Sequence, residues 1–279
     1  MIAALIRLMR LYYSLPLSCG LIVIVAYVTA GDFGAVDSPV TLVFLSLCST
    51  ISGAYVLNDV CDVAVDAINC PQKMLPRGMV TRKIALAWSI TLFAIGIVLA
   101  YFCRWPYVIM LATITAGLIL YDLFSKRLGI FKDVLVAVLV TSLYPLALTL
   151  ARPVSGPALK SLFIFPVWLF FTAMGYEMLK DIRDFKGDSQ ARVKLFQRCC
   201  DKPKFLFAAR IIIFSASVLT VLPFVLGYCK WIYLVSSAGA ITLAGLSLKC
   251  PPIKAIRFIY VEVFLITAGS MVDLMVFGA

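Results

Sequence analysis

The chain has 279 residues, of which 63% are apolar and 14% are charged, and its formal net charge is +11. Soluble domains are roughly half apolar and about a quarter charged, so this composition excludes a cytosolic enzyme, a disordered chain and a secreted disulfide-rich scaffold. The 9 cysteines are scattered without a Cys-x-x-Cys pair and histidine is absent, which argues against a zinc site. In so apolar a chain, the positive charge indicates loops facing the cytoplasm and no nucleic-acid partner. We expect a polytopic membrane protein.

Apolar stretches of about 20 residues, long enough to cross a bilayer, occur nine times along the chain. They lie near 11–30, 41–60, 84–102, 105–123, 133–151, 159–179, 205–228, 231–248 and 256–278. The stretches are continuously apolar and do not alternate with a period of two, which predicts helices and not a barrel. Pro145, Pro166 and Pro223 lie inside these stretches and should kink them. The predicted fold is all-α: nine transmembrane helices in a bundle, as a single domain over 1–279.

Lysine and arginine are distributed unevenly between alternate connections. With the N-terminus in the cytoplasm, and with Lys160 and Arg257 at the span ends counted with the loops that they adjoin, the inside segments carry 20 of them and the outside segments only 4. A wrong number of spans would destroy this bias, because alternate loops would change sides. We therefore expect a cytoplasmic N-terminus, in an integral protein of the cell (inner) membrane.

Two acidic stripes repeat the same spacing. Asp59, Asp62 and Asp66 are spaced i, i+3, i+7, and so are Asp181, Asp184 and Asp188. On a helix these offsets fall on one narrow face about 10 Å long, at the cytoplasmic ends of the second and sixth spans. Helix ends exposed to solvent are the simpler interpretation. However, repeated like charges destabilise a helix unless a cation compensates them. Mg²⁺, a hard ion that combines carboxylates with phosphate oxygens, is the cation that the pattern favours, with Mn²⁺ as an alternative.

Basic and aromatic residues follow the stripes on the same side. Lys73, Arg77, Lys180 and Arg192 lie close enough in sequence to neutralise a diphosphate, although cytoplasmic loops are basic in any case. Tyr121 and Lys126 close the fourth span on this side, where an interfacial aromatic belt is the alternative.

At this point the sequence resembles the UbiA superfamily of intramembrane prenyltransferases. The resemblance is carried by Asn58-Asp59-x-x-Asp62-x-x-x-Asp66, by Ile68-Asn69-x-Pro71-x-x-x-Leu75-Pro76-x-Gly78, and by Lys180-Asp181-x-x-Asp184-x-x-Gly187-Asp188. It implies two Asp-rich motif loops, 58–83 and 177–204, beside a central cavity that opens to lipid. The chain departs from the family pattern at Lys73-Met74, Lys132-Asp133 and Lys194-Leu195-Phe196, where Arg-Pro, Gly-Asn and Thr-Leu-Pro are usual. Because of these departures, the resemblance does not identify the prenyl acceptor.

The resemblance also implies roles for individual residues. Asn58, Asp62 and Asp66 would hold one side of an Mg²⁺–diphosphate, and Asp181, Asp184 and Asp188 the other. Tyr121 and Lys126 resemble the family's middle-loop pair, and Arg10 resembles an arginine that orients the acceptor. The full expected site contains metal ligands Asp59, Asp62, Asp66, Asp181, Asp184 and Asp188; catalytic Asp62, Asp66, Asp181, Asp184, Tyr121 and Lys126; and substrate-binding Asn58, Lys73, Arg77, Lys180, Arg192 and Arg10.

The expected reaction is Mg²⁺-dependent transfer of an isoprenyl group from a prenyl diphosphate to a lipophilic or aromatic acceptor, of quinone-precursor or lipid type, within the membrane lipid. Two alternatives remain open: a terpene cyclase of the same family, which needs no acceptor, and a cation or phosphate transporter. A shared site requires the two acidic helix ends to face each other across a polar cavity that opens into an apolar groove. A separation of more than about 20 Å would be too large for one Mg²⁺–diphosphate bridge.

Overall fold

The structure is a computed structural model that describes residues 1–128, 131–190 and 202–278, with backbone only at 125–127, 186–190 and 202. Its elements in chain order are α1 (Ile2–Leu8), α2 (Leu11–Val28), the 3-10 turn η1 (Phe33–Ala35), α3 (Val40–Asn69), α4 (Arg82–Tyr101), α5 (Trp105–Leu128), α6 (Phe131–Thr141), α7 (Leu143–Leu148), α8 (Pro157–Ser161), α9 (Phe165–Gln190), α10 (Lys202–Leu219), α11 (Leu222–Val225), α12 (Trp231–Ser247) and α13 (Pro252–Phe277). Within these described ranges, β structure is limited to one isolated bridge between Val36 and Ala151. The predicted all-α class is confirmed.

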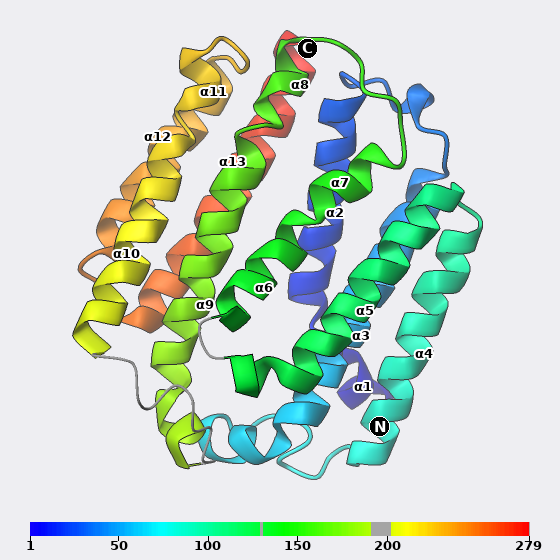
Figure 1. Ribbon diagram of the computed structural model, residues 1–279, viewed down its shortest axis with the longest axis vertical. Coiled ribbons are helices and arrows are strands. Elements are labelled where there is room, and N and C mark those ends of the chain that lie inside the picture. Colours follow the sequence, from blue (N-terminus) through cyan, green and yellow to red (C-terminus); the bar gives the residue numbers. More distant parts are fainter. Residues whose placement is uncertain (129–130, 191–201, 279) are drawn as a thin grey trace.

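Eight segments of the described chain are long and apolar enough to cross a membrane, and α12, with 17 residues, is apolar but shorter. The two termini lie at opposite ends of the bundle (Figure 1), as an odd number of crossings requires. Nine crossings and the orientation of the N-terminus stay predictions.

Each proline predicted to kink a span instead lies in the first turn of a new helix. Pro145 lies in α7, just after the break at Ser142, while Pro166 is the second residue of α9 and Pro223 the second of α11. Proline has no N–H to donate, so the first turn of a helix accepts it more readily than the interior does. The expected kinks are therefore complete breaks followed by a restart.

The helices that carry the acidic stripes continue well past their apolar parts. α3 extends to Asn69 and α9 to Gln190, whereas the apolar stretches end near 60 and 179. The acidic parts of the two predicted motif loops are thus helical. α3 ends where Cys70 precedes Pro71, because a residue before proline is disfavoured in the helical conformation.

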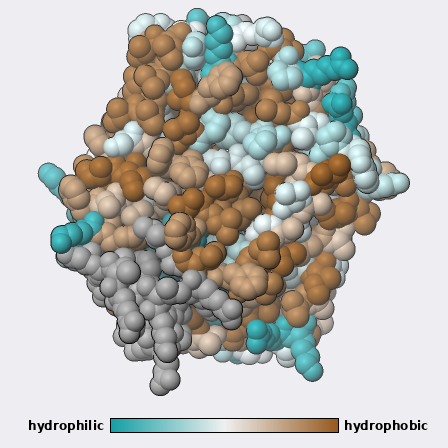
Figure 2. All heavy atoms as spheres, viewed as in Figure 1, coloured by the Kyte–Doolittle hydropathy of each residue, from teal (hydrophilic) through white to brown (hydrophobic). Residues whose placement is uncertain are grey.

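The outer surface suits a lipid environment. Figure 2 shows a face dominated by apolar residues, with most of the strongly hydrophilic ones near its edges. Large apolar side chains with more than half of their surface exposed include Ile90, Leu120, Phe163, Phe207, Val235, Phe264 and Met275. Such exposure would be unfavourable in water but is expected of helices that face lipid.

Candidate active site

One large cavity lies within the bundle, with a volume of about 1490 Å³. Its walls come from α2, α3, α5, α6, α9 and α13, with contributions from α1 and from the connection after α3. The polar end is lined by Asp59, Asp62 and Asp66 of α3 and by Asp181 and Asp184 of α9. Apolar side chains line the remainder, including Leu17, Ile51, Leu118, Leu139, Leu169 and Val263. The predicted meeting of the two acidic helix ends across a cavity is confirmed.

A direct hydrogen bond joins the two helices at this end. The Asn69 side-chain amide donates to the main-chain carbonyl oxygen of Asp184 over 2.9 Å. Asn69 lies one turn beyond Asp66 on α3, so the two stripes are neighbours. The separation of more than about 20 Å that would exclude a shared diphosphate does not occur.

Basic side chains neutralise the first stripe. Asp59 is 5% exposed and accepts hydrogen bonds from Arg10 and, over 3.0 Å, from Lys73. Lys73 also donates to Asp66 over 2.7 Å. A buried carboxylate is stable only when paired in this way. Lys73 therefore holds two members of the stripe together.

Arg10 reaches the stripe through an unusual backbone conformation. It joins α1 to α2 with a φ of 47° and a ψ of 50°, a left-handed geometry that costs about 1–2 kcal/mol in a residue with a Cβ. Burial alone would lower the pKa of Arg10. The negative charge of Asp59, with smaller effects of Tyr12 and Tyr55, outweighs burial and raises this pKa. Its guanidinium also lies 5.3 Å from the ring centre of Tyr55. These contacts offset the strained turn and keep a permanent cation at the cavity.

The second stripe is neutralised by a different set of cations. Asp181, 7% exposed, pairs with Lys132 of α6, and Arg183 pairs with Asp184 over 2.7 Å. Cavity-lining Glu177 accepts two hydrogen bonds from Lys180, over 2.8 and 3.0 Å. The roles of Lys132, Arg183 and Glu177 were not predicted. Lys132 lies 49 residues from Asp181 in sequence, and no local pattern connects them.

Residues near the end of α5, which corresponds to the fourth predicted span, also line the cavity. Tyr121 lines it as expected, and so does the neighbouring Asp122, which sequence reasoning missed. Asn58 donates to Asp122 Oδ1 over 3.2 Å, whereas the buried Oδ2 has no hydrogen-bond partner. A buried oxygen without a partner is destabilising unless a ligand or proton meets it.

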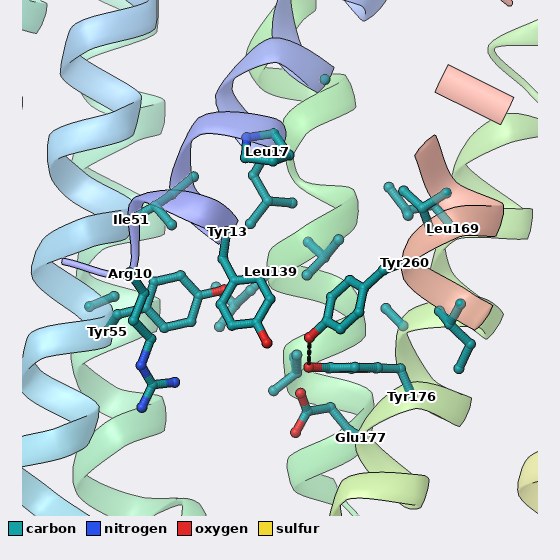
Figure 3. A pocket seen from close by; sticks show the side chains of 18 of the residues that line it. Arg10, Tyr13, Leu17, Ile51, Tyr55, Leu139, Leu169, Tyr176, Glu177 and Tyr260 are labelled. Atoms are coloured by element: carbon teal, nitrogen blue, oxygen red, sulfur yellow. Dashed lines mark hydrogen bonds between the residues drawn. The ribbon is translucent and has the colours of Figure 1, made fainter. Parts of the chain in front are cut away.

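Four tyrosines form a layer between the polar and apolar parts of the cavity (Figure 3). Tyr13 of α2 stacks on Tyr260 of α13 with ring centres 5.2 Å apart, and Tyr55 of α3 lies 5.7 Å from Tyr13. The hydroxyl groups of Tyr176 on α9 and Tyr260 form a hydrogen bond. Rings from four helices thus cover the boundary where a diphosphate would give way to its hydrocarbon chain.

Most of the predicted site residues lie at the cavity. Those that line it are Arg10, Asn58, Asp59, Asp62, Asp66, Lys73, Tyr121, Lys180, Asp181 and Asp184. Arg77 is exposed and does not line the cavity. The side chains of Lys126 and Asp188, and all of Arg192, lie outside the described residues.

The donor set fits a divalent ion that arrives together with a phosphate ligand. Within the described ranges, no three acidic, cysteine or histidine side chains gather closely enough to hold a metal alone. The carboxylates are instead paired with lysine and arginine. Mg²⁺ needs only one or two protein carboxylates and takes its other ligands from water and phosphate. Carboxylates from both helices, Asp62 and Asp184 among them, are present in one cavity for this purpose.

Comparisons with known proteins agree with this geometry. The family model described as the UbiA prenyltransferase family matches residues 17–249. A digeranylgeranylglyceryl phosphate synthase from Methanopyrus kandleri is 31% identical over 253 residues, covering 85% of this chain and 88% of that protein. One of the same name from Saccharolobus solfataricus is 35% identical over 185 residues, which span 66% of this chain and 64% of that relative's length.

A solved structure shares the fold. A UbiA homologue from Archaeoglobus fulgidus, bound to GPP and Mg²⁺, superposes with a TM-score of 0.65 over 98% of this chain and all (100%) of that chain, at 14% identity. Cavity, acidic stripes and sequence matches converge on one assignment. The chain belongs to the UbiA prenyltransferase family and is an integral membrane prenyltransferase.

Proposed function

We propose that this chain transfers an isoprenyl group from a prenyl diphosphate to the hydroxyl group of a lipid acceptor with a glyceryl phosphate headgroup, with Mg²⁺ as the metal. The observation that carries the proposal is that one cavity has carboxylates of both acidic stripes at its polar end and apolar walls beyond. A prenyl diphosphate has the same division into a charged head and a hydrocarbon chain.

The size of the cavity supports two bound substrates. Its volume of about 1490 Å³ exceeds the roughly 300–1,000 Å³ of pockets that take one small ligand. The apolar walls would bind the prenyl chain at about 0.8 kcal/mol per buried CH₂. The relatives named digeranylgeranylglyceryl phosphate synthase favour a lipid acceptor over a quinone precursor, and the homologue bound to GPP and Mg²⁺ favours Mg²⁺.

In the reaction, the allylic C–O bond breaks and its electron pair leaves with the diphosphate. Bound Mg²⁺ would supply neutralisation of charge on that leaving group. Arg10 and Lys73 lie beside the first stripe and can donate hydrogen bonds to phosphate oxygens as their charge grows. The apolar walls exclude water, which would otherwise capture the carbocation. The tyrosine layer, between the polar and apolar parts of the cavity, offers π faces that can stabilise this positive charge.

The acceptor then completes the transfer. Its hydroxyl oxygen forms the new C–O bond and loses its proton, for which Asp122, a cavity-lining carboxylate whose buried Oδ2 has no hydrogen-bond partner, is the candidate acceptor. The products are a prenyl ether and diphosphate. The excess of lysine and arginine in one set of loops supports placing this site on the cytoplasmic side of the cell membrane.

The test is incubation of purified protein with Mg²⁺, a graded series of prenyl diphosphates and two acceptor pools, read by mass spectrometry. One pool contains alkyl glyceryl phosphates and the other aromatic quinone precursors. We expect a prenyl ether from the first pool, which the Asp62→Ala/Asp184→Ala double variant does not form. A product of the aromatic pool would overturn the acceptor, and hydrocarbon formed without any acceptor would indicate a cyclase. Ion flux in proteoliposomes without product would indicate a transporter.

A further inference from the structure

Lys132 reaches from α6 across the polar end of the cavity to the second acidic stripe. Its ammonium nitrogen pairs with Asp181 Oδ1 and lies 3.9 Å from Asp133 Oδ1. The side chain of Lys132 is 17% exposed, that of Asp181 10% and that of Asp133 0%. In the described part of the chain, Lys132 is the one basic side chain within salt-bridge distance of Asp181.

The neighbouring charges on α9 are already paired. Glu177 is held by Lys180, and Asp184 by Arg183. Without Lys132, Asp181 would remain as a nearly buried carboxylate with no salt-bridge partner, a strongly unfavourable state. Lys132 therefore neutralises Asp181 and occupies Oδ1, one of the two oxygens through which this carboxylate could bind an incoming Mg²⁺.

Asp133 gives Lys132 a second anchor. Both of its carboxylate oxygens are buried without a hydrogen-bond partner, so the nearby ammonium is its source of neutralisation. Lysine carries a compact charge on a flexible stem, which allows it to exchange one oxygen partner for another. Asp133 can thus keep the ammonium at the cavity wall after Lys132 has released Asp181.

We propose that Lys132 is a tethered counter-ion of the second acidic stripe. It neutralises Asp181 before ligands bind, yields that carboxylate to Mg²⁺, and then donates a hydrogen bond to a diphosphate oxygen. The inference rests on the proposed function for the identity of the anion. It requires two opposite effects: Lys132 weakens metal binding by the ligand-free protein and strengthens diphosphate binding.

The first effect is measured with Mn²⁺ as the probe, by electron paramagnetic resonance titration without any diphosphate. Lys132→Met should bind Mn²⁺ about tenfold more tightly than wild type, because apparent affinity scales with the fraction of protein whose site is open. Asp181→Asn added to Lys132→Met should remove the gain. The control is Lys160→Met, which changes an exposed lysine that contacts the ring of Tyr228 away from the cavity, and it should leave Mn²⁺ affinity unchanged. Equal affinities in wild type and Lys132→Met would overturn the proposal.

The second effect is measured by equilibrium dialysis of labelled inorganic pyrophosphate with saturating Mg²⁺. Lys132→Met should bind pyrophosphate about tenfold more weakly, as expected for the loss of one charge-assisted hydrogen bond. Lys132→Arg keeps the charge and should stay within a few-fold of wild type. Pyrophosphate affinity unchanged in Lys132→Met would overturn the second half of the proposal.

Further controls distinguish the proposed role of Lys132 from misfolding of a variant and from failure of the proposed function. Each variant is compared with wild type by thermal unfolding in detergent, and Lys132→Gln, which removes the positive charge but keeps a neutral polar side chain, replaces any Lys132→Met protein that does not fold, with the same directions of change expected. A chain with the expected Mn²⁺ and pyrophosphate affinities but no prenylated product would refute the proposed function and leave this inference standing. Prenyl transfer with both affinities unchanged in Lys132→Met would refute this inference alone.

Discussion

The side-chain amide of Asn69 on α3 donates a hydrogen bond to the main-chain carbonyl oxygen of Asp184 on α9, over 2.9 Å. The bond joins two helices whose stripes are separated by more than a hundred residues in sequence. Because it lies at the end of the first stripe and within the second, it sets their relative position. We therefore expect the geometry of the proposed diphosphate site to depend on a residue that carries no charge.

Asn69→Ala should reduce both stability and turnover. We expect a loss of about 1 kcal/mol in the free energy of unfolding, the usual value of one hydrogen bond. We also expect roughly a tenfold lower turnover, because small displacements of reacting groups are costly. Thermal unfolding in detergent and the mass-spectrometric assay measure the two effects. Gln72→Ala removes an exposed amide from the following loop and should change neither, and equal activities of the two variants would contradict the positioning role.

Asp62→Ala and Asp184→Ala should each lower turnover at least about 10²-fold, the scale of losing one preorganised electrostatic group at a transition state. Both carboxylates line the cavity, one from each helix. The matched control is Asp37→Ala, which removes an exposed carboxylate paired with Arg104 and should leave turnover near wild type. Wild-type rates in either stripe variant, with folding intact, would assign the stripes a structural role.

The acidic stripes could be predicted because their chemistry repeats at helical spacing within a few residues of sequence. The partners of the stripes could not. Lys132 and Asp181 are 49 residues apart and Arg10 and Asp59 also 49, so their contacts exist only after helices pack. The hydropathy pattern located the spans but placed their ends where charged residues begin. The backbone of α3 instead remains helical through the acidic stripe to Asn69.

The tyrosine layer illustrates the same limit. Tyr13, Tyr55, Tyr176 and Tyr260 come from four helices, and each one alone is indistinguishable from an interfacial aromatic residue. Arg77 shows the opposite error, since proximity in sequence to the first stripe suggested a role that its exposed position does not support. Sequence spacing predicts which side chains lie together within one helix, but it does not predict which side chains lie together across a loop.

Removing divalent ions should abolish turnover. The two stripes carry several carboxylates in one cavity, and a diphosphate cannot approach them without cations in between. After exhaustive chelation with EDTA we expect no product, and added Mg²⁺ or Mn²⁺ should restore it while Ca²⁺, which prefers a larger and looser shell, should restore less. Undiminished transfer in EDTA would show that the basic side chains alone support the reaction.

Cys70 offers a probe of site occupancy that does not depend on turnover. It lines the cavity between the two stripes, and burial raises the pKa of its thiol. Because the thiolate is the reactive form, alkylation at neutral pH should be slow and should become faster as the pH rises toward that raised pKa. Prenyl diphosphate with Mg²⁺ should protect Cys70, as followed by mass spectrometry of the alkylated peptides.

Cys103 is the matched control for this experiment. Burial also raises the pKa of its thiol, and it is comparably accessible, but it does not line the cavity. Its alkylation should have a similar pH dependence and should not respond to prenyl diphosphate. Protection of both cysteines would indicate a global change in the protein, and protection of neither would place the diphosphate elsewhere.

Leu169→Trp should shift the enzyme toward shorter prenyl diphosphates. Leu169 lines the apolar part of the cavity, 12 residues before Asp181 on the same helix, which places it about 18 Å along the axis from the acidic end. A tryptophan there would occupy space that a long chain needs, and each CH₂ that can no longer be buried costs about 0.8 kcal/mol. A chain that ends before this depth would lose nothing. We therefore expect kcat/KM to fall for the longest prenyl diphosphates and to be kept for the shortest, measured over a graded series.

Val167→Trp is the control, because Val167 is 44% exposed on the same helix and does not line the cavity, so its chain-length profile should match wild type. An equal loss for all chain lengths in Leu169→Trp would mean that the prenyl chain does not follow this wall.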